Sequence, residues 1–153
     1  TRSAEVARLA RAAGAATVLH SLPGRNDTVR LGLDALLGEC PGLGGCIFLP
    51  GDQPLLRRES LEAMVRDFHA QKETERVILR LGWRAGGAEP LLGSPVLFGS
   101  GHFDALRALP EGKGGGVVIR QHPGCVRAVY AQSAEELEDA DTVERLEALK
   151  RFL

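Results

Sequence analysis

Short apolar runs alternate along this chain with longer segments whose apolar residues recur at helical spacing. One such pair is the segment 58–70, in which Met64 and Phe68 lie one turn apart, followed by the apolar run 77–79. A period near 3.6 predicts a helix with one buried side, and a short apolar run between turn residues predicts a buried strand. Alternation of the two favours a mostly parallel sheet with helices on both faces. We therefore predict an α/β fold, built as a three-layer, doubly wound sheet.

The same patterns predict the individual elements. Helices are expected over residues 3–13 with Ser3 as N-cap, from Asn26 or Asp27 onward, and over 58–70, 103–109, 117–122 and the tail after 141. Strands are expected over residues 16–19, 46–49, 77–79, 96–98 and 125–130. Glycine-rich loops are expected over 82–93, which could also form a hairpin, and over 111–116. Inward-facing residues are expected at Val6, Leu9, Ala10 and Ala13 in the first helix and at Val143, Leu146, Leu149 and Phe152 in the last.

Composition excludes several classes of protein. The chain has 153 residues, 44% of them hydrophobic, and a net charge of −1 without a basic stripe, which argues against nucleic-acid and membrane-surface binding. Its three cysteines are an odd number without the spacing of metal ligands, as expected for reduced thiols in the cytoplasm. Without an apolar stretch of about 20 residues or an opening signal peptide, the chain is predicted to be one cytoplasmic domain.

The stretch "FLPGDQPLL", residues 48–56, places a carboxylate directly after an apolar run. Asp52 follows Pro50 and Gly51, and this is ordinary turn chemistry. The alternative is a metal-binding carboxylate, because open α/β sheets bind their ligands at the carboxyl ends of the strands. The motif alone leaves both interpretations open, and the turn is the simpler one.

A second pair of acids, Asp139 and Asp141, precedes the expected last helix. Acids there could cap free N–H groups and suit the helix dipole. They could also join Asp52 in a site of hard oxygen ligands, which Mg²⁺ prefers. Magnesium held by one or two carboxylates is typical of nucleotidyl transfer, in which the ion screens a triphosphate.

The order of several motifs resembles that of a known family. The motifs are "RNDTVRLGLDAL", "IFLPGDQPLL", "GSPVLFGSGHFDALRAL", "EGKGGGVVIRQHPG" and "DADTVERL". Together they resemble the MobA-like NTP transferases, and most of all the molybdenum cofactor cytidylyltransferases. The resemblance spans nearly the whole chain and implies the fold of the nucleotide-diphospho-sugar transferases.

The resemblance implies roles for particular residues. Asp52, Asp139 and Asp141 would be catalytic metal ligands, with either member of the second pair as the second ligand. The implied binding residues for nucleotide and pterin are Asn26, Asp27, Thr28, Gly51, Gln53, Ser94, Pro95, Lys113 and Gly114. The implied reaction attaches CMP, or GMP as the less favoured choice, from CTP or GTP to molybdopterin with Mg²⁺. It needs positioning and charge neutralisation more than an activated protein nucleophile.

The chain departs from the family pattern in several places. The family opens with a strand and a glycine-rich loop that cradles the triphosphate, and this sequence has neither, so we expect a longer natural protein and treat residues 1–153 as one partial domain. Ser94 stands where the family commonly has histidine, and Gly112 and Gly116 replace an acid and an arginine. The alternative is a non-catalytic relative that binds or delivers the cofactor, or assists a molybdoenzyme. Among the histidines, only His122 is singled out as a functional candidate.

Overall fold

The computed structural model describes residues 1–86 and 89–152. The chain forms two compact units, each described below by itself. The first comprises Thr1–Leu43 and Gly101–Pro123, and the second comprises Gly44–Ser100 and Gly124–Leu153. Each unit therefore combines an early and a late part of the chain.

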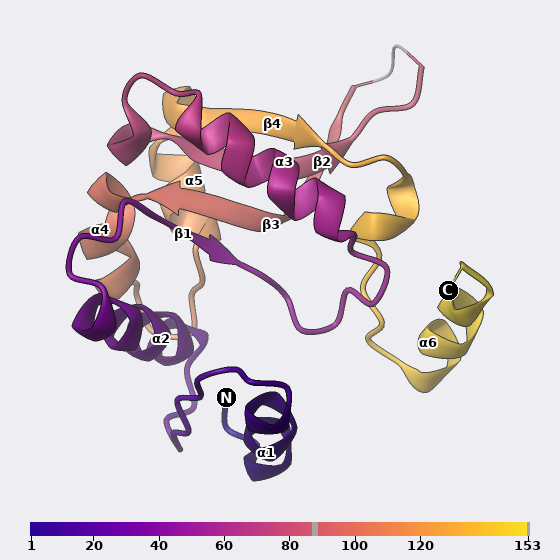
Figure 1. Ribbon diagram of the computed structural model, residues 1–153, viewed down its shortest axis with the longest axis horizontal. Coiled ribbons are helices and arrows are strands. Elements are labelled where there is room, and N and C mark those ends of the chain that lie inside the picture. Colours follow the sequence, from indigo (N-terminus) through magenta and orange to yellow (C-terminus); the bar gives the residue numbers. More distant parts are fainter. Residues whose placement is uncertain (87–88, 153) are drawn as a thin grey trace. The chain divides into compact units, whose positions relative to one another are not determined.

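The second unit contains an open sheet of four strands in the order β1-β3-β2-β4 (Figure 1). The strands are β1 (Gly45–Phe48), β2 (Ile78–Trp83), β3 (Leu91–Gly99) and β4 (Val126–Tyr130). β3 runs antiparallel to β1 and β2, whereas β4 runs parallel to β2, so β1, β2 and β4 share one direction. The predicted α/β class is confirmed, and the sheet is mixed because β3 is antiparallel to both of its neighbours.

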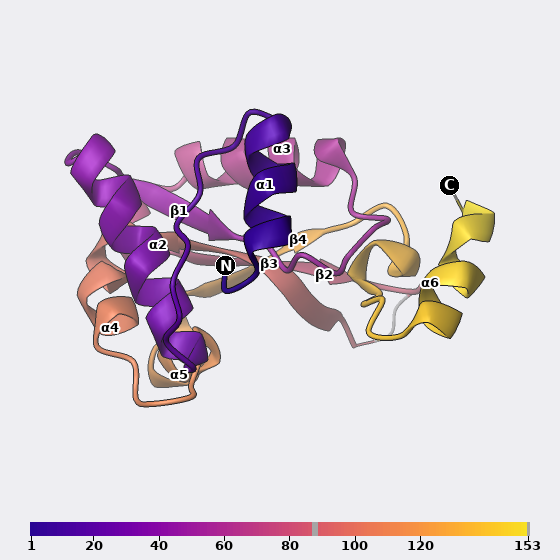
Figure 2. The same cartoon turned by 90° about the horizontal axis from the view of Figure 1, so that it is seen from below.

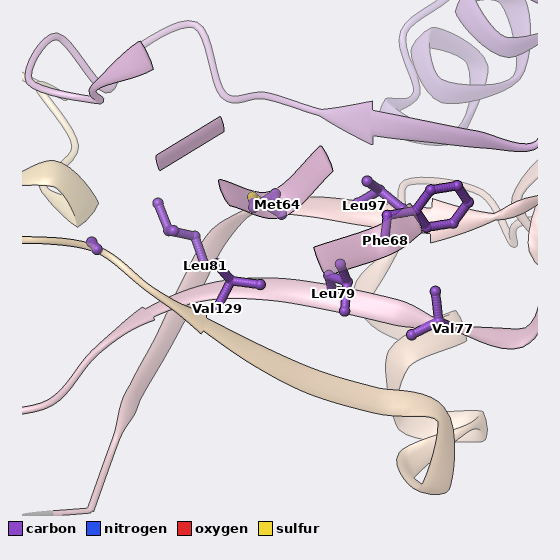
Figure 3. Packing of buried hydrophobic residues seen from close by; sticks show 8 residues of the cluster. Met64, Phe68, Val77, Leu79, Leu81, Leu97 and Val129 are labelled. Atoms are coloured by element: carbon purple, nitrogen blue, oxygen red, sulfur yellow. The ribbon is translucent and has the colours of Figure 1, made fainter. Parts of the chain in front are cut away.

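One face of this sheet packs against α3 (Arg58–His69). Met64 and Phe68 of α3 point toward Leu79 of β2 and Val129 of β4 (Figure 3). The cluster is completed by Val77, Leu81, Leu97 and Ala131. Burying each large apolar side chain contributes about 1.5–3 kcal/mol, so this seam is a major source of stability for the unit.

β2 and β3 are longer than predicted, and the pairing between them contains a shift in register. The predicted loop 82–93 is strand at both ends, and residues 87 and 88 within it lie outside the described residues. The register shifts between Arg80 and Gly82, and the Arg80 guanidinium donates to the carbonyl oxygens of Leu92 at 2.9 Å and Gly93 at 3.3 Å. Burial lowers the pKa of Arg80. Its side chain thus ties the two strands together beside the bulge.

The second unit ends with α6 (Val143–Leu149), which is followed by a 3₁₀ turn, Lys150–Phe152. Thr142 caps α6 by accepting a hydrogen bond from Arg145 N at 3.1 Å. Of its expected inward residues only Leu149 is buried, whereas Val143 is 71% exposed. The expected inward positions of Val143, Leu146 and Phe152 are therefore wrong, because helical spacing defines a stripe but not the surface that covers it.

The first unit is helical. Its helices are α1 (Ala4–Ala12), α2 (Arg25–Glu39), α4 (Phe103–Arg107) and α5 (Gly116–Gln121). α2 and α4 lie side by side (Figure 2), with Arg107 Nε donating to Asp34 Oδ1 at 2.7 Å. Leu33 of α2 and Leu106 of α4 are fully buried.

α1 begins as predicted and presents a different face. Ser3 is the N-cap and accepts a hydrogen bond from Val6 N at 3.2 Å. Ala7 is the buried residue of α1, whereas Val6 and Leu9 are 52% and 53% exposed, so the predicted inward stripe is wrong.

The strand predicted at residues 16–19 is absent from the described chain, where residues 15–24 are neither helix nor strand. The segment instead pairs with the first residue, since the Thr1 ammonium group donates to Val18 O at 2.8 Å and His20 N donates to Thr1 O at 3.1 Å. None of the helices in residues 1–86 and 89–152 combines the length and apolar character needed to cross a membrane.

Candidate functional site

The turn after β1 meets the loop that follows β4 in the second unit. Asp52 lies in this turn, exposed to solvent, and its main-chain carbonyl accepts a hydrogen bond from Ala140 N at 2.7 Å. Ala140 separates Asp139 from Asp141, so the acid pair is held beside the strand tip through the backbone. The structure thus brings the Asp52 turn and the acid-bearing loop together through main-chain atoms, and a metal ion shared by their carboxylates stays a prediction.

The Gln53 side chain adds a second link between the turn after β1 and the loop after β4. Its amide nitrogen donates to Asp139 Oδ1 at 3.1 Å and to Leu137 O at 3.5 Å. The other amide atom, Oε1, is buried and has no hydrogen-bond donor among the described residues. Gln53 therefore positions the Asp139 carboxylate beside the turn that carries Asp52.

The oxygen donors at this turn suit a hard divalent cation. Asp52, Asp139 and Asp141 are all exposed carboxylates, the ligand type that Mg²⁺ takes in proteins. Within the described residues, no three His, Cys, Asp or Glu side chains form a group that could hold a metal ion. A bound magnesium ion would therefore need oxygen atoms from water or substrate phosphate beside these acids.

A buried acid, Glu136, fixes the segment that leads to Asp139. Glu136 is 1% exposed, and it accepts hydrogen bonds from Arg57 N at 3.3 Å, Gln132 N at 2.9 Å and the Ser60 hydroxyl. Arg57 and Ser60 lie at the start of α3, where free N–H groups and the helix dipole favour a negative charge. The sequence interpretation missed Glu136, because its partners in α3 are far away along the chain.

Ser94 and Pro95 lie in β3 of the same unit, joined by a cis peptide bond. Ser94 is half-buried and Pro95 is buried. The preceding residue, Gly93, faces Leu137, whose Cδ2 would lie 3.4 Å from a Cβ added there. β3 therefore approaches the segment that carries Asp139.

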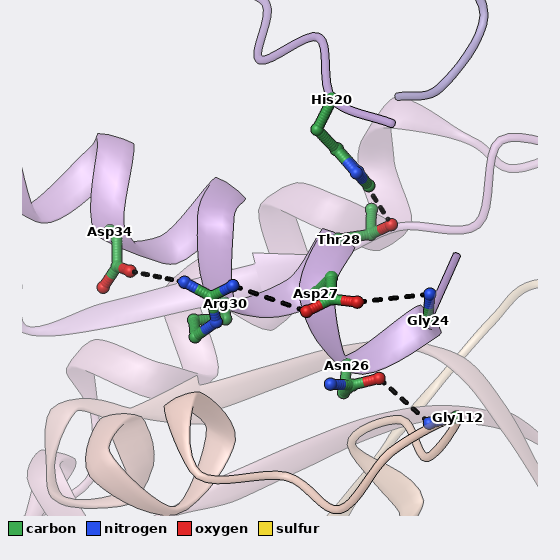
Figure 4. Close-up of polar contacts among 8 residues, drawn as sticks. All are labelled: His20, Gly24, Asn26, Asp27, Thr28, Arg30, Asp34 and Gly112. Atoms are coloured by element: carbon green, nitrogen blue, oxygen red, sulfur yellow. Dashed lines mark hydrogen bonds and ion pairs between the residues drawn. The ribbon is translucent and has the colours of Figure 1, made fainter. Parts of the chain in front are cut away.

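In the first unit, the beginning of α2 is hydrogen-bonded to the glycine-rich loop 111–116 (Figure 4). Asn26 Oδ1 accepts a hydrogen bond from Gly112 N at 2.9 Å, across 86 residues of sequence. Gly112 has a φ of +68°, a conformation that favours glycine. A Cβ at Gly114 would lie 2.9 Å from Arg25 Cδ, so the loop passes close to the first residue of α2.

Asp27 and Thr28 serve the start of α2. The N-cap is Gly24 rather than Asn26 or Asp27, and Asp27 Oδ2 accepts from Gly24 N at 3.2 Å. The observed cap therefore lies two residues before Asn26 and three before Asp27, because an acid in the first turn reaches back to the N-cap N–H. Thr28 Oγ1 lies 3.1 Å from His20 Nε2.

Two further predicted residues, Lys113 and His122, lie in the first unit. Lys113 is exposed, and its main-chain N–H donates to Pro110 O at 3.0 Å within the turn. The His122 ring lies 5.0 Å from that of His102, measured between centroids. A phosphate contact by Lys113 and a functional role for His122 stay predictions.

Comparison with known proteins identifies the family. A model of the MobA-like NTP transferase domain matches residues 1–128. The chain belongs to this family. MobA-like membership supports a nucleotidyltransferase type of function and a small-molecule NTP as substrate. The matched residues of this MobA-like chain include Asp52 and Gln53 and end before Asp139.

Solved structures share the fold of this MobA-like chain. Rv0371c from Mycobacterium tuberculosis H37Rv is 24% identical with a TM-score of 0.71, and the match covers 95% of this chain and 72% of that protein. The Rv0371c homolog from Mycobacterium sp. strain JC1 is 21% identical with a TM-score of 0.60, covering 88% of this chain and 62% of the homolog. No curated protein matches the chain.

Proposed function

We propose that the protein attaches CMP, with GMP as the less favoured nucleotide, from an NTP to molybdopterin in a Mg²⁺-dependent reaction. The observation that carries the proposal is the hydrogen bond from Ala140 N to Asp52 O, which joins the strand-tip acid to the acid pair. Turn chemistry alone requires no such partner. Its presence favours a shared site for carboxylates delivered from two distant segments.

In the proposed reaction, a terminal phosphate oxygen of molybdopterin forms a bond to the α-phosphorus of CTP. The bond from that phosphorus to the bridging oxygen breaks, and pyrophosphate leaves. Asp52 with Asp139 or Asp141 would hold Mg²⁺, which when bound neutralises charge on the triphosphate. Gln53 holds Asp139 in place, so the acids meet the ion with little reorganisation.

The remaining predicted residues receive binding roles in this proposal. Asn26, Asp27 and Thr28 would serve nucleotide binding, and Gly51 would allow close approach at the strand tip. Ser94, Pro95, Lys113 and Gly114 would serve pterin binding.

A second candidate function is binding or delivery of the molybdenum cofactor without transfer, as a partner of a molybdoenzyme. It is favoured by the departures from the family pattern at Ser94, Gly112 and Gly116, which stand where the family commonly has a histidine, an acid and an arginine. The two candidates differ in pyrophosphate release.

The test uses the protein expressed from its complete reading frame. It is mixed with molybdopterin, Mg²⁺ and CTP, GTP or ATP, and released pyrophosphate is measured. We expect release with CTP and a loss of kcat of about 100-fold or more in Asp52→Asn. The matched control Asp67→Asn changes an exposed acid on α3 and should keep full activity.

Pyrophosphate release that survives Asp52→Asn would overturn the metal assignment. Molybdopterin binding without release with any of the three nucleotides would replace transfer by the delivery function. Absence of both binding and release would overturn both candidates.

A further inference from the structure

The second unit has a pocket at the end of its sheet opposite the candidate metal acids. The pocket has a volume of about 570 Å³ and is lined where β2 and β4 begin, whereas Asp52 follows the end of β1. Because β1, β2 and β4 run in one direction, the pocket and Asp52 lie at opposite ends of these strands. The pocket is lined by Ala70, Gln71, Lys72, Glu73, Arg76, Val77, Gly124, Cys125 and Arg127.

The charged side chains around this pocket are mostly cationic. The lining contains three cations and one acid, which leaves a local excess of two positive charges. The cations are Lys72, Arg76 and Arg127, and the acid is Glu73. The whole chain carries a net charge of −1, so this excess is a local feature. Glu73 pairs with Arg76 at 3.2 Å, and their side chains are 64% and 67% exposed. Such an exposed pair contributes at most about 1 kcal/mol, so an incoming anion can compete with Glu73 for Arg76.

Arg127 is already oriented at the pocket wall. It lies on β4 two residues before Val129, on the sheet face that α3 covers. Its Nη1 donates to the carbonyl oxygens of Gly124 and Val126, both at 2.8 Å. One nitrogen of the guanidinium group therefore makes both contacts. A guanidinium held in this way loses little freedom when its other N–H groups bind the two oxygens of a phosphate.

The end of α3 opposes anion binding, but weakly. The carbonyl end of a helix carries about half a negative charge. Gln71 satisfies part of it, since its Nε2 donates to Asp67 O at 3.0 Å and its main-chain N donates to Phe68 O at 3.1 Å. The excess of two cationic side chains outweighs this partial charge.

We propose that this pocket is a second ligand site, which binds a small phosphate-bearing anion. Its volume of about 570 Å³ suits a small molecule of nucleotide size. Two arginines and a lysine provide planar and point-charge donors for phosphate oxygens. The cations form a single cluster instead of a stripe, which favours a compact ligand over a nucleic-acid strand.

The test uses inorganic pyrophosphate in the presence of EDTA, so that a metal-dependent active site does not contribute. Binding is measured by isothermal titration calorimetry on the complete protein. We expect binding that weakens with added NaCl, and a loss of affinity of about tenfold or more in Lys72→Gln and in Arg127→Gln. The matched control Arg84→Gln changes an exposed arginine beyond the end of β2 and should bind normally.

Cys125 provides an internal readout because it lines the pocket. Pyrophosphate should slow alkylation of Cys125 and leave the exposed Cys40 unchanged, as followed by mass spectrometry of peptides. Asp52→Asn should keep both binding and protection, which separates this site from the proposed active site. Because Arg127 contacts main-chain carbonyls, thermal melting checks the fold of its variant, and the exposed Lys72 serves as the independent variant.

Three outcomes would overturn the proposal. The first is the absence of metal-free pyrophosphate binding. The second is binding that is unchanged in Lys72→Gln and fails to protect Cys125. Loss of binding in Asp52→Asn with retention in Lys72→Gln would equally assign the anion to the strand tip instead.

Discussion

The carboxylate of Glu136 accepts a hydrogen bond of 2.5 Å from the hydroxyl group of Ser60, which lies 76 residues earlier in the chain. Both side chains are buried. The contact joins the first turn of α3 to the segment that leads to Asp139 and Asp141. A carboxylate at this helix start satisfies free N–H groups and meets the positive end of the dipole. It therefore supports both the core of the second unit and its candidate site.

Glu136→Ala should lower the free energy of unfolding by about 2–3 kcal/mol, because the Ser60 hydroxyl and two N–H groups lose their acceptor. Urea denaturation measures the change. The control Glu144→Ala removes an exposed acid on α6 and should stay within about 0.5 kcal/mol of the wild type. Equal stabilities of the two variants would show that Glu136 does not act as a cap.

Met64→Ala should cost about 2–5 kcal/mol, because Met64 is fully buried and its removal leaves a cavity between α3 and the sheet. The neighbouring Val65 is 42% exposed, and Val65→Ala should cost less than about 1 kcal/mol. Thermal or urea unfolding of both proteins tests which side of α3 faces the sheet. A larger loss in Val65→Ala would reverse that assignment.

Gly99→Ala should destabilise the second unit by at least about 2 kcal/mol. The added Cβ would lie 2.0 Å from the carbonyl oxygen of Thr74 and 2.7 Å from that of Glu75, and main chain cannot move aside easily. Gly51→Ala is the matched control, since an added Cβ there meets nothing within 4 Å. Comparable melting temperatures for the two variants would contradict the close approach of β3 to residues 74 and 75.

Asn26→Ala should loosen the glycine-rich loop, because Gly112 N loses its acceptor. Loss of one hydrogen bond worth about 1 kcal/mol should raise the open population about fivefold. Limited trypsin digestion after Lys113 measures that population. Asn26→Asp keeps an acceptor oxygen and should be cleaved at the wild-type rate, whereas faster cleavage of both variants would argue for a different role of Asn26.

Cys46 should be alkylated more slowly than the exposed Cys40, because burial raises the pKa of the Cys46 thiol above its ordinary value of 9.0. Above that value the unfolded chain loses this proton while the folded chain keeps it, so stability is full at lower pH and falls as the pH rises. Urea unfolding between about pH 7 and pH 10 should therefore show a steeper loss for the wild type than for Cys46→Ala. Parallel curves would contradict burial of the thiol.

Local sequence patterns predicted the elements that depend on nearest neighbours. α3 was predicted to within one residue, since its apolar side chains keep helical spacing over three turns. The Ser3 cap and the strand before Asp52 were predicted in the same way, from a hydroxyl residue at a helix start and an apolar run before a proline turn. The motif order also predicted the family, whereas the shared metal site of Asp52 and the acid pair stays a prediction.

Long-range contacts decided the rest. The segment 16–19 has strand-like residues, yet it bonds to Thr1 instead of a sheet. The exposed stripe of α6 has helical spacing, yet only Leu149 finds a buried position. The pairing of Glu136 with Ser60 and of Asn26 with Gly112 leaves no trace in spacing, because each pair joins residues that are distant in sequence.

The sequence by itself determined most of the helical and extended segments, with residues 16–19 as the exception, and which acids follow a strand or precede a helix, because these depend on a few adjacent residues. Only the tertiary structure decided that β3 runs against its neighbours, that Glu136 is buried, and that a cationic pocket forms where β2 and β4 begin. Strand direction, burial and pocket formation depend on which distant surfaces exclude water from one another, and periodicity in a single segment does not specify its partner.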